Sequence, residues 1–162
     1  ARPRAAMEHL ERPRVPPWKL AELGRLVEDR DFQLLQLRLS KWPDDDRTAE
    51  VQSAQRTLQE WTPLYEEQSS SISAVVTRRD VAAVERALGD WNFATNQLPS
   101  VLGRHRLARW KPVYEQTAAM LRAAVQSRDI PAARAQLDTW IFTESDINVL
   151  EASRLVAGGP PA

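Results

Sequence analysis

The chain has 162 residues and no cysteine, which excludes disulfides, thiolate metal sites and cysteine nucleophiles. Its 22 basic and 22 acidic side chains cancel, so it lacks the basic surplus that nucleic-acid-binding proteins usually need. With 43% hydrophobic residues it can bury one core, and no apolar run approaches the roughly 20 residues that span a bilayer.

The first predicted element is an extended arm at residues 1–17, rich in proline and arginine. Its basic side chains are Arg2, Arg4, Arg12 and Arg14, and no helical spacing of apolar residues runs through it. Such a segment cannot bury enough apolar surface to order itself. Because guanidinium groups pair bidentately with carboxylates, we expect the arm to bind an acidic surface of a partner protein. The alternative is an arm that stays solvated.

A unit of 49 residues repeats over the rest of the chain. Trp42, Trp91 and Trp140 are spaced by 49 residues, and the same interval separates Trp61 from Trp110. Self-similarity at a fixed period of this length is typical of helical-repeat proteins. We expect a single domain at 18–157 with units at about 18–43, 44–92 and 93–141, a terminal helix at 144–157 and a tail at 158–162.

Each unit contains a predicted short helix that follows an aspartate. Asp31, Asp80 and Asp129 are suited to cap a helix N-terminus. Apolar residues then recur at the spacing of one helix face. These faces are Phe32, Leu35, Leu39 and Trp42; Val81, Val84, Leu88 and Trp91; and Ile130, Ala133, Leu137 and Trp140.

A longer helical stretch precedes each of the last two short helices, at about 46–77 and 95–127. Pro63 and Pro112 interrupt these stretches at matching positions, so each is one kinked helix or two helices. Thr62 is suited to cap a helix that begins at Pro63, which favours a break. Since strand patterns are missing, the predicted fold class is all-α, with three tandem helical repeats forming a bundle or a short solenoid.

Aromatic and leucine side chains that recur at the repeat interval are the predicted core. They are Leu39, Trp42, Leu58, Trp61, Tyr65, Leu88, Trp91, Leu107, Trp110, Tyr114, Leu137 and Trp140. We expect Trp91, in the middle unit, to be largely buried. The alternative is that some of the Leu-x-x-Trp pairs are exposed anchors for a partner. In that respect the helices resemble the centrin-binding repeats of centrosomal filament proteins.

The densest basic segment is residues 104–111. Its Arg104, Arg106 and Arg109 are partner-binding candidates together with the arginines of the arm. They suit an acidic protein surface or a phosphate-rich polymer, the alternative being a solvated helix face. The run from Asp44 to Asp46 lacks the spacing of a calcium loop, and we expect it to cap the next helix.

No residue pattern indicates catalysis or a cofactor. The two histidines, His9 and His105, lack further ligands at helical spacing, so we predict no metal site. Ser69 to Ser71 lack the context of a nucleophile, and phosphate-binding and dinucleotide-binding fingerprints are missing. We therefore expect no catalytic residue and no bound cofactor.

The segment Leu26-Val-Glu-Asp-Arg-Asp-Phe-Gln-Leu-Leu-Gln-Leu-Arg-Leu39 resembles one stretch of the PsbQ-like extrinsic subunits of photosystem II. In that family a helix ends in a charged turn containing Asp, and the next helix carries an aromatic residue, spaced leucines and an arginine. The proline-rich start at Ala1 is similar to a lumenal subunit after cleavage of its targeting sequence. The resemblance implies a four-helix bundle and a non-catalytic thylakoid-lumen subunit that stabilises or links a photosynthetic complex.

The sequence thus predicts a structural or linker subunit that binds other protein subunits of a larger assembly. It would reach a membrane only peripherally, through its partners. One alternative is a nucleic-acid-binding repeat, which needs basic residues aligned on one face of successive units. Another is an enzyme or cofactor carrier, which needs a pocket with convergent polar groups.

Overall fold

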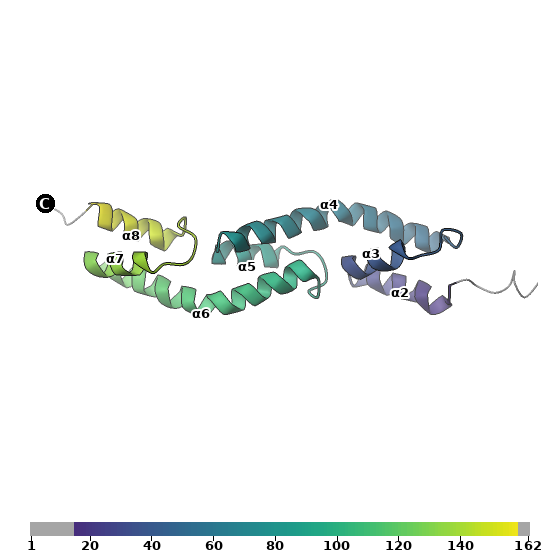
Figure 1. The fold of residues 1–162 in the computed structure, drawn as a ribbon, viewed down its shortest axis with the longest axis horizontal. Helices are drawn as coiled ribbons and strands as arrows, with labels where there is room; N and C mark the ends of the chain where they lie inside the picture. The colour runs from purple at the N-terminus through teal and green to yellow at the C-terminus, as the bar shows by residue number, and fades with distance from the viewer. Residues whose placement is uncertain (1–14, 159–162) are drawn as a thin grey trace, which may run out of the picture. The chain divides into compact units, whose positions relative to one another are not determined.

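The computed structural model describes residues 15–158, so the arginines of the arm lie outside the described residues (Figure 1). It contains seven helices over this range: α2 (Pro17–Glu28), α3 (Phe32–Ser40), α4 (Ala49–Thr77), α5 (Val81–Gly89), α6 (Leu98–Ser127), α7 (Ile130–Asp138) and α8 (Ile147–Gly158). No strand occurs between residues 15 and 158, and the predicted all-α fold class is confirmed. None of these helices combines the length and hydropathy that crossing a membrane requires.

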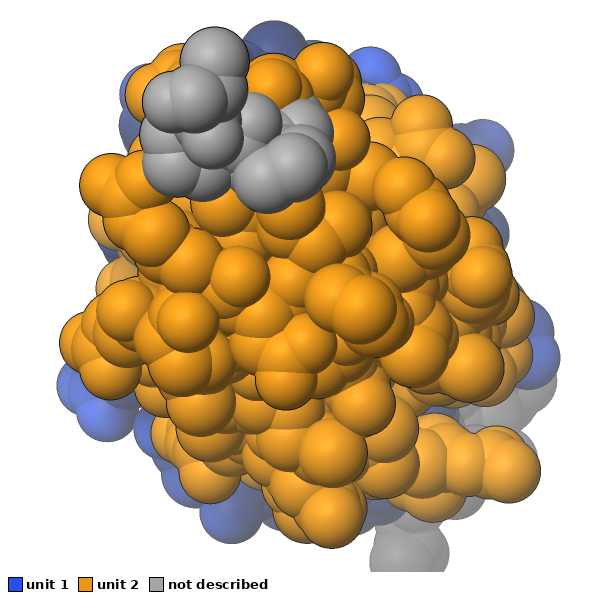
Figure 2. All heavy atoms as spheres, turned by 90° about the vertical axis from the view of Figure 1, so that its left-hand side faces the viewer, with its two compact units in different colours: residues 1–67, 92–97 blue, residues 68–91, 98–162 orange. Residues whose placement is uncertain are grey.

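The chain forms two compact units, coloured separately in Figure 2. Unit 1 comprises the residues up to 67 together with residues 92–97, and unit 2 comprises residues 68–91 and those from 98 onward. Unit 1 therefore holds α2, α3 and the first part of α4, and unit 2 holds the rest of α4 and α5 to α8. The loop at 92–97 follows α5 in the sequence but belongs to the unit of the first helices.

Three short helices of nine residues, α3, α5 and α7, begin 49 residues apart. Each follows an arginine with a left-handed backbone and an aspartate that caps the helix. The arginines are Arg30 and Arg79, with φ of 55°, and Arg128, with φ of 54°. Oδ1 of Asp31, Asp80 and Asp129 accepts a hydrogen bond, 3.1 Å long, from the amide three residues later. The three predicted caps are confirmed.

The long helices run through their prolines, so the expected break at Pro63 is wrong. Pro63 lies inside α4 and Pro112 inside α6. The Thr62 hydroxyl does not cap a new helix; it donates to the Leu58 carbonyl at 2.7 Å, a bond within the helix. Figure 1 shows α6 bent near the middle of its length, which is where Pro112 falls in the sequence.

A threonine, and not the run of aspartates, caps α4. The carbonyl of Thr48 accepts from the Gln52 amide at 3.0 Å, and its hydroxyl lies 3.4 Å from the Val51 amide. Asp44 instead pairs with Arg47 at 3.1 Å. The prediction for Asp44 to Asp46 is therefore wrong, because the helix begins three residues beyond the run.

The inward side of each long helix follows alternating steps of three and four residues, the spacing of a packed helix seam. On α4 it is formed by Val51, Ala54, Leu58, Trp61, Tyr65, Gln68, Ile72 and Val75, and on α6 by Ser100, Gly103, Leu107, Trp110, Tyr114, Thr117, Leu121 and Ala124. All of these side chains are buried or half-buried. In unit 2, the last two residues of the α6 seam, Leu121 and Ala124, form a core with α7 and α8.

The predicted core residues are buried to different extents. Trp42 and Trp61 are buried, at 6% and 8% exposure. Trp91, expected to be largely buried, is half-buried, as are Trp110 and Trp140. Leu39 is buried, while Leu58, Tyr65, Leu88, Leu107, Tyr114 and Leu137 are half-buried.

Candidate functional site

A loop docks on the first arginine turn, within unit 1. The Arg30 carbonyl accepts from the Ala94 amide at 3.0 Å, and the Arg30 Nε donates to the Asn92 carbonyl. Gln97, which is only 1% exposed, donates from Nε2 to Oδ1 of the capping Asp31 at 2.8 Å. The loop at 92–97 is therefore fastened to the start of α3 by backbone and side-chain bonds.

An aromatic cluster holds the same loop. Phe93 meets the rings of Phe32, Trp61 and Tyr65 edge-on, with centroid distances of 6.0, 5.8 and 5.2 Å. Phe32 stacks on Tyr65 at 4.0 Å, and the Arg30 guanidinium lies 5.1 Å from the Trp61 ring centre. Edge-on contacts of this kind add to the free energy of burying the rings. Phe93 is the anchor of the loop, at 6% exposure.

Unit 2 repeats the arrangement at its own arginine turn. The Arg79 carbonyl accepts from the Thr143 amide at 3.2 Å, and the Arg79 Nη1 lies 3.4 Å from the Ile141 carbonyl. Phe142, also 6% exposed, is the anchor and meets the Tyr114 ring edge-on at 5.4 Å. Neither anchoring phenylalanine belonged to the predicted core. The signal that points to them is the repeated Trp-x-Phe at 91–93 and 140–142.

The phenolic hydroxyl of Tyr114 has a strongly shifted pKa. This hydroxyl donates to Oδ2 of Asp146 at 2.5 Å. Burial, the hydrogen bond to Asp146 and the charge of that carboxylate raise the pKa of Tyr114 to about 12. Oδ1 of Asp146 accepts from the Asn148 amide at 2.8 Å at the start of α8. The pair therefore ties the middle of α6 to α8.

The third arginine turn has no docked loop among residues 15–158. Arg128 nevertheless ends its helix as the others do, since the next amide, of Asp129, donates to Ala124 at 2.9 Å. The matching bond from Asp31 to Leu26 is also 2.9 Å long. The local Arg-Asp sequence thus produces the turn without a loop to hold it.

Two grooves occupy equivalent positions in the two units, the first between α2 and α4 and the second between α4 and α6. The first groove has a volume of about 520 Å³ and is lined by Leu20, Leu23, Gly24, Val27, Glu28, Ala49, Glu50, Ser53, Ala54 and Thr57. The second groove, of about 310 Å³, is lined by Ser69, Ile72, Ser73, Val76, Thr77, Leu98, Pro99, Leu102, Gly103 and Arg106. Every residue of the second lies 49 positions after one of the first.

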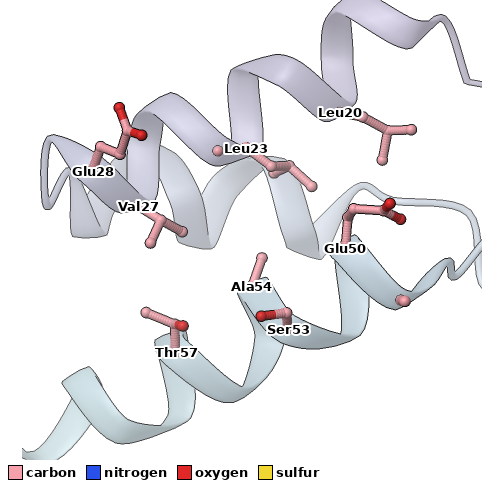
Figure 3. Close-up of a pocket in the computed structure, with 10 residues that line it drawn as sticks. Leu20, Leu23, Val27, Glu28, Glu50, Ser53, Ala54 and Thr57 are labelled. Carbon is pink, nitrogen blue, oxygen red and sulfur yellow. The ribbon is translucent and has the colours of Figure 1, made fainter.

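The first groove has an apolar floor and charged ends. Leu23 and Ala54 form the floor, at 2% and 4% exposure. Figure 3 shows Glu28 on α2 and Glu50 on α4 toward opposite ends of the groove. Hydrogen bonds from its own backbone amide and from Thr48 lower the pKa of Glu50, which keeps this carboxylate ionised. A ligand that suits this groove is apolar along its length, to match the floor, and carries basic groups, to match the two carboxylates.

The second groove has a tighter floor and larger walls. Gly103 packs so closely that an added Cβ would lie 3.0 Å from Leu88 and 3.1 Å from Ile72. Leu98 and Leu102 project from α6, with 55% and 53% of their surfaces exposed. These side chains stand where the first groove has Ala49 and Ser53, which accounts for the smaller volume.

The predicted basic residues of α6 do not form one patch. Arg104, Arg106 and Arg109 are all exposed, but Arg104 and Arg106 are about 200° apart around the helix at roughly 100° per residue. Arg106 alone of the three lines the second groove. Lys111 pairs with Glu85 of α5 at 3.5 Å.

No group of three or more metal-ligating side chains is assembled within residues 15–158. Comparison with known proteins returned no match to a family model, a curated protein or a solved structure. The resemblance of residues 26–39 to PsbQ-like subunits, with the lumenal location it implies, therefore stays a prediction.

Proposed function

We propose that the chain is a non-catalytic structural or linker subunit, built from tandem helical units, that binds other proteins within a larger assembly. The tandem organisation is supported by the recurrence of capped short helices, arginine turns and lining residues at the 49-residue interval. The docked loops support a fixed shape of each unit, since each loop is held by a buried phenylalanine and backbone bonds.

The observation that carries the proposal is the pair of equivalent grooves. Each lies between two helices and has an apolar floor, and six of its ten lining residues are apolar or glycine. Grooves of this kind receive the apolar face of a partner helix, whose side chains at helical spacing fill the depression. Two such grooves at equivalent positions suit a protein that holds helical segments of its partners.

Two glycines provide a matched test of the proposal. Gly24 lines the first groove and Gly89 ends α5, and a Cβ at either position meets nothing within 4 Å. We expect Gly24→Trp to fill the groove without disturbing the fold and to abolish capture of partner proteins from the native source. Gly89→Trp should capture the same partners as the wild-type chain.

Circular dichroism of both variants controls for folding. If Gly24→Trp folds and captures the same partners as Gly89→Trp, the first groove is not the binding site. If the wild-type chain captures no protein while turning over a small-molecule substrate, the structural role is wrong.

A further inference from the structure

The two grooves are complementary to each other. Ala49 and Ser53 leave space on the α4 wall of the first groove, whereas Leu98 and Leu102 fill the same positions on the α6 wall of the second. The first groove is the larger, at about 520 Å³ against 310 Å³. One unit of the chain thus presents an apolar cavity, and the other presents an apolar ridge, formed by Leu98 and Leu102, at the equivalent place.

The charges of the two grooves are also opposite. The first groove is lined by Glu28 and Glu50 and by no basic residue. The second is lined by Arg106 and by no acidic residue. In the described part of the chain neither carboxylate forms an ion pair with a basic side chain, and Arg106 forms none with an acidic one. Opposite potentials on facing surfaces steer association and fix its register.

The exposure of the apolar ridge indicates an interaction site. Leu98 and Leu102 are both more than half exposed, and the neighbouring Val101 is 40% exposed. Contiguous apolar side chains of this kind on a helix surface mark interaction sites, whereas scattered ones need no explanation. The zero net charge of the chain also removes the repulsion that keeps highly charged proteins apart.

We propose that copies of this chain associate with one another, the α6 ridge of one copy entering the first groove of another. Leu102 then fills the space above Ala49 and Ser53, and the positive charge of Arg106 enters a groove that carries the carboxylates of Glu28 and Glu50 at its two ends. The contact joins two different surfaces of the same chain. It therefore closes a pair when both contacts of two copies form together, and extends into a chain of copies when they do not.

This inference rests on the proposed function in one respect, that the grooves bind helices. It requires no other protein, so sedimentation equilibrium of the pure chain over a wide range of concentration tests it. We expect reversible association that weakens as salt is added, because the ion pairs lie at the surface. Leu102→Ser should weaken it at least about tenfold, the equivalent of 1.4 kcal/mol.

Complementary charge reversals make the test specific. Arg106→Glu alters the ridge, and the double variant Glu28→Arg with Glu50→Arg alters the groove. Each variant alone should associate at least about tenfold more weakly than wild type, whereas their equimolar mixture should associate again because both contacts regain opposite charges. Arg56→Glu is the control, since Arg56 is exposed on α4 and lines neither groove; it should behave as wild type.

If the wild-type chain stays monomeric at every concentration, the inference of self-association is overturned, and the grooves would then bind only other proteins. A mixture of the two charge variants that stays as dissociated as each alone overturns it as well. If the chain is monomeric while capture of other proteins still depends on Gly24, only the self-association is wrong. If both tests fail, the proposed function fails with it.

Discussion

Arg30, Arg79 and Arg128 hold the same left-handed backbone, with φ between 54° and 55°. For a residue with a Cβ this conformation costs roughly 1–2 kcal/mol, and glycine adopts it freely. Arg30 offsets the cost through its guanidinium, which bonds to the docked loop and lies over the rings of Trp61 and Phe93 at 5.1 and 5.2 Å. Arg128 receives no docked loop within the described residues.

We therefore expect opposite effects from the same substitution at two positions. Arg128→Gly should raise the free energy of unfolding by about 0.5–1 kcal/mol, because strain is relieved and no loop contact is lost. Arg30→Gly should lower it by about 1 kcal/mol, because the lost hydrogen bond and cation–π contacts outweigh the relief. Urea unfolding of both variants measures the difference, and equal effects would contradict the role given to the guanidinium.

Tyr114 makes stability depend on pH in an alkaline window. Its folded-state pKa of about 12 lies above the ordinary value of 10.0, so the folded chain holds the phenolic proton more tightly than the unfolded chain does. The contribution to stability is fully present below about pH 10 and is lost as the pH rises towards about 12.

Tyr114→Phe should remove this part of the pH dependence. Unfolding of the variant should then lose less free energy between about pH 10 and pH 12 than unfolding of the wild type. Ultraviolet absorbance of the phenolate provides a second measurement, in which a late titration of the wild type should be missing from Tyr114→Phe. Parallel pH profiles for the two proteins would show that Asp146 does not hold the proton in place.

The three short helices begin with the same cap but differ in what else the cap binds. Asp31, Asp80 and Asp129 each accept from the amide three residues on. Asp31 also accepts from Nε2 of the buried Gln97 at 2.8 Å. Loss of a cap costs about 1 kcal/mol, and loss of a second bond to a buried amide costs about 1 kcal/mol more.

Asp31→Ala should thus lower the free energy of unfolding by about 2 kcal/mol, against about 1 kcal/mol for Asp80→Ala or Asp129→Ala. Chemical denaturation of the three variants under one set of conditions makes the comparison. A loss at Asp31 no larger than at the other two positions would mean that Gln97 contributes nothing through this bond.

The sequence was sufficient to predict the local features of these elements. The caps and short helices follow from Asp and apolar spacing alone, which act within a few residues. The course of the chain at Pro63 was predicted wrongly, because Thr62 bonds back into its own helix and the seam continues on both sides of the proline. The anchoring role of Phe93 depends on rings from α3 and α4, a contact that spacing along the chain does not reveal.

The grooves could not be predicted from the sequence either, because they also depend on contacts between helices. Ala49 and Ser53 carry no chemistry of their own, and they define a cavity only because α2 and α4 lie beside it in the folded unit. The sequence indicated Arg106 as a partner-binding candidate because of its charge, but it did not indicate Leu98 and Leu102 on the same helix. The repeat interval nevertheless made the correspondence predictable once one groove is known, since the other lies 49 residues later.

At the scale of the whole chain, we expect the basic arm to bind partner proteins. Val15 is buried and α2 begins at Pro17, so the segment to delete is residues 1–14 and not the full expected arm of 1–17. We expect the truncated chain to keep its helical circular dichroism, because the seven described helices begin after the cut. It should capture partner proteins more weakly, and the remaining capture should depend less on salt, because salt screens the pairing of guanidinium groups with carboxylates that the deletion removes. The matched control for charge is the full-length chain in which glutamine replaces Arg2, Arg4, Arg12 and Arg14, and this variant should reproduce the loss.

Equal capture by the truncated and full-length chains at every salt concentration would exclude the arm as a partner-binding segment. A loss of helical signal in the truncated chain would show instead that the arm supports the fold.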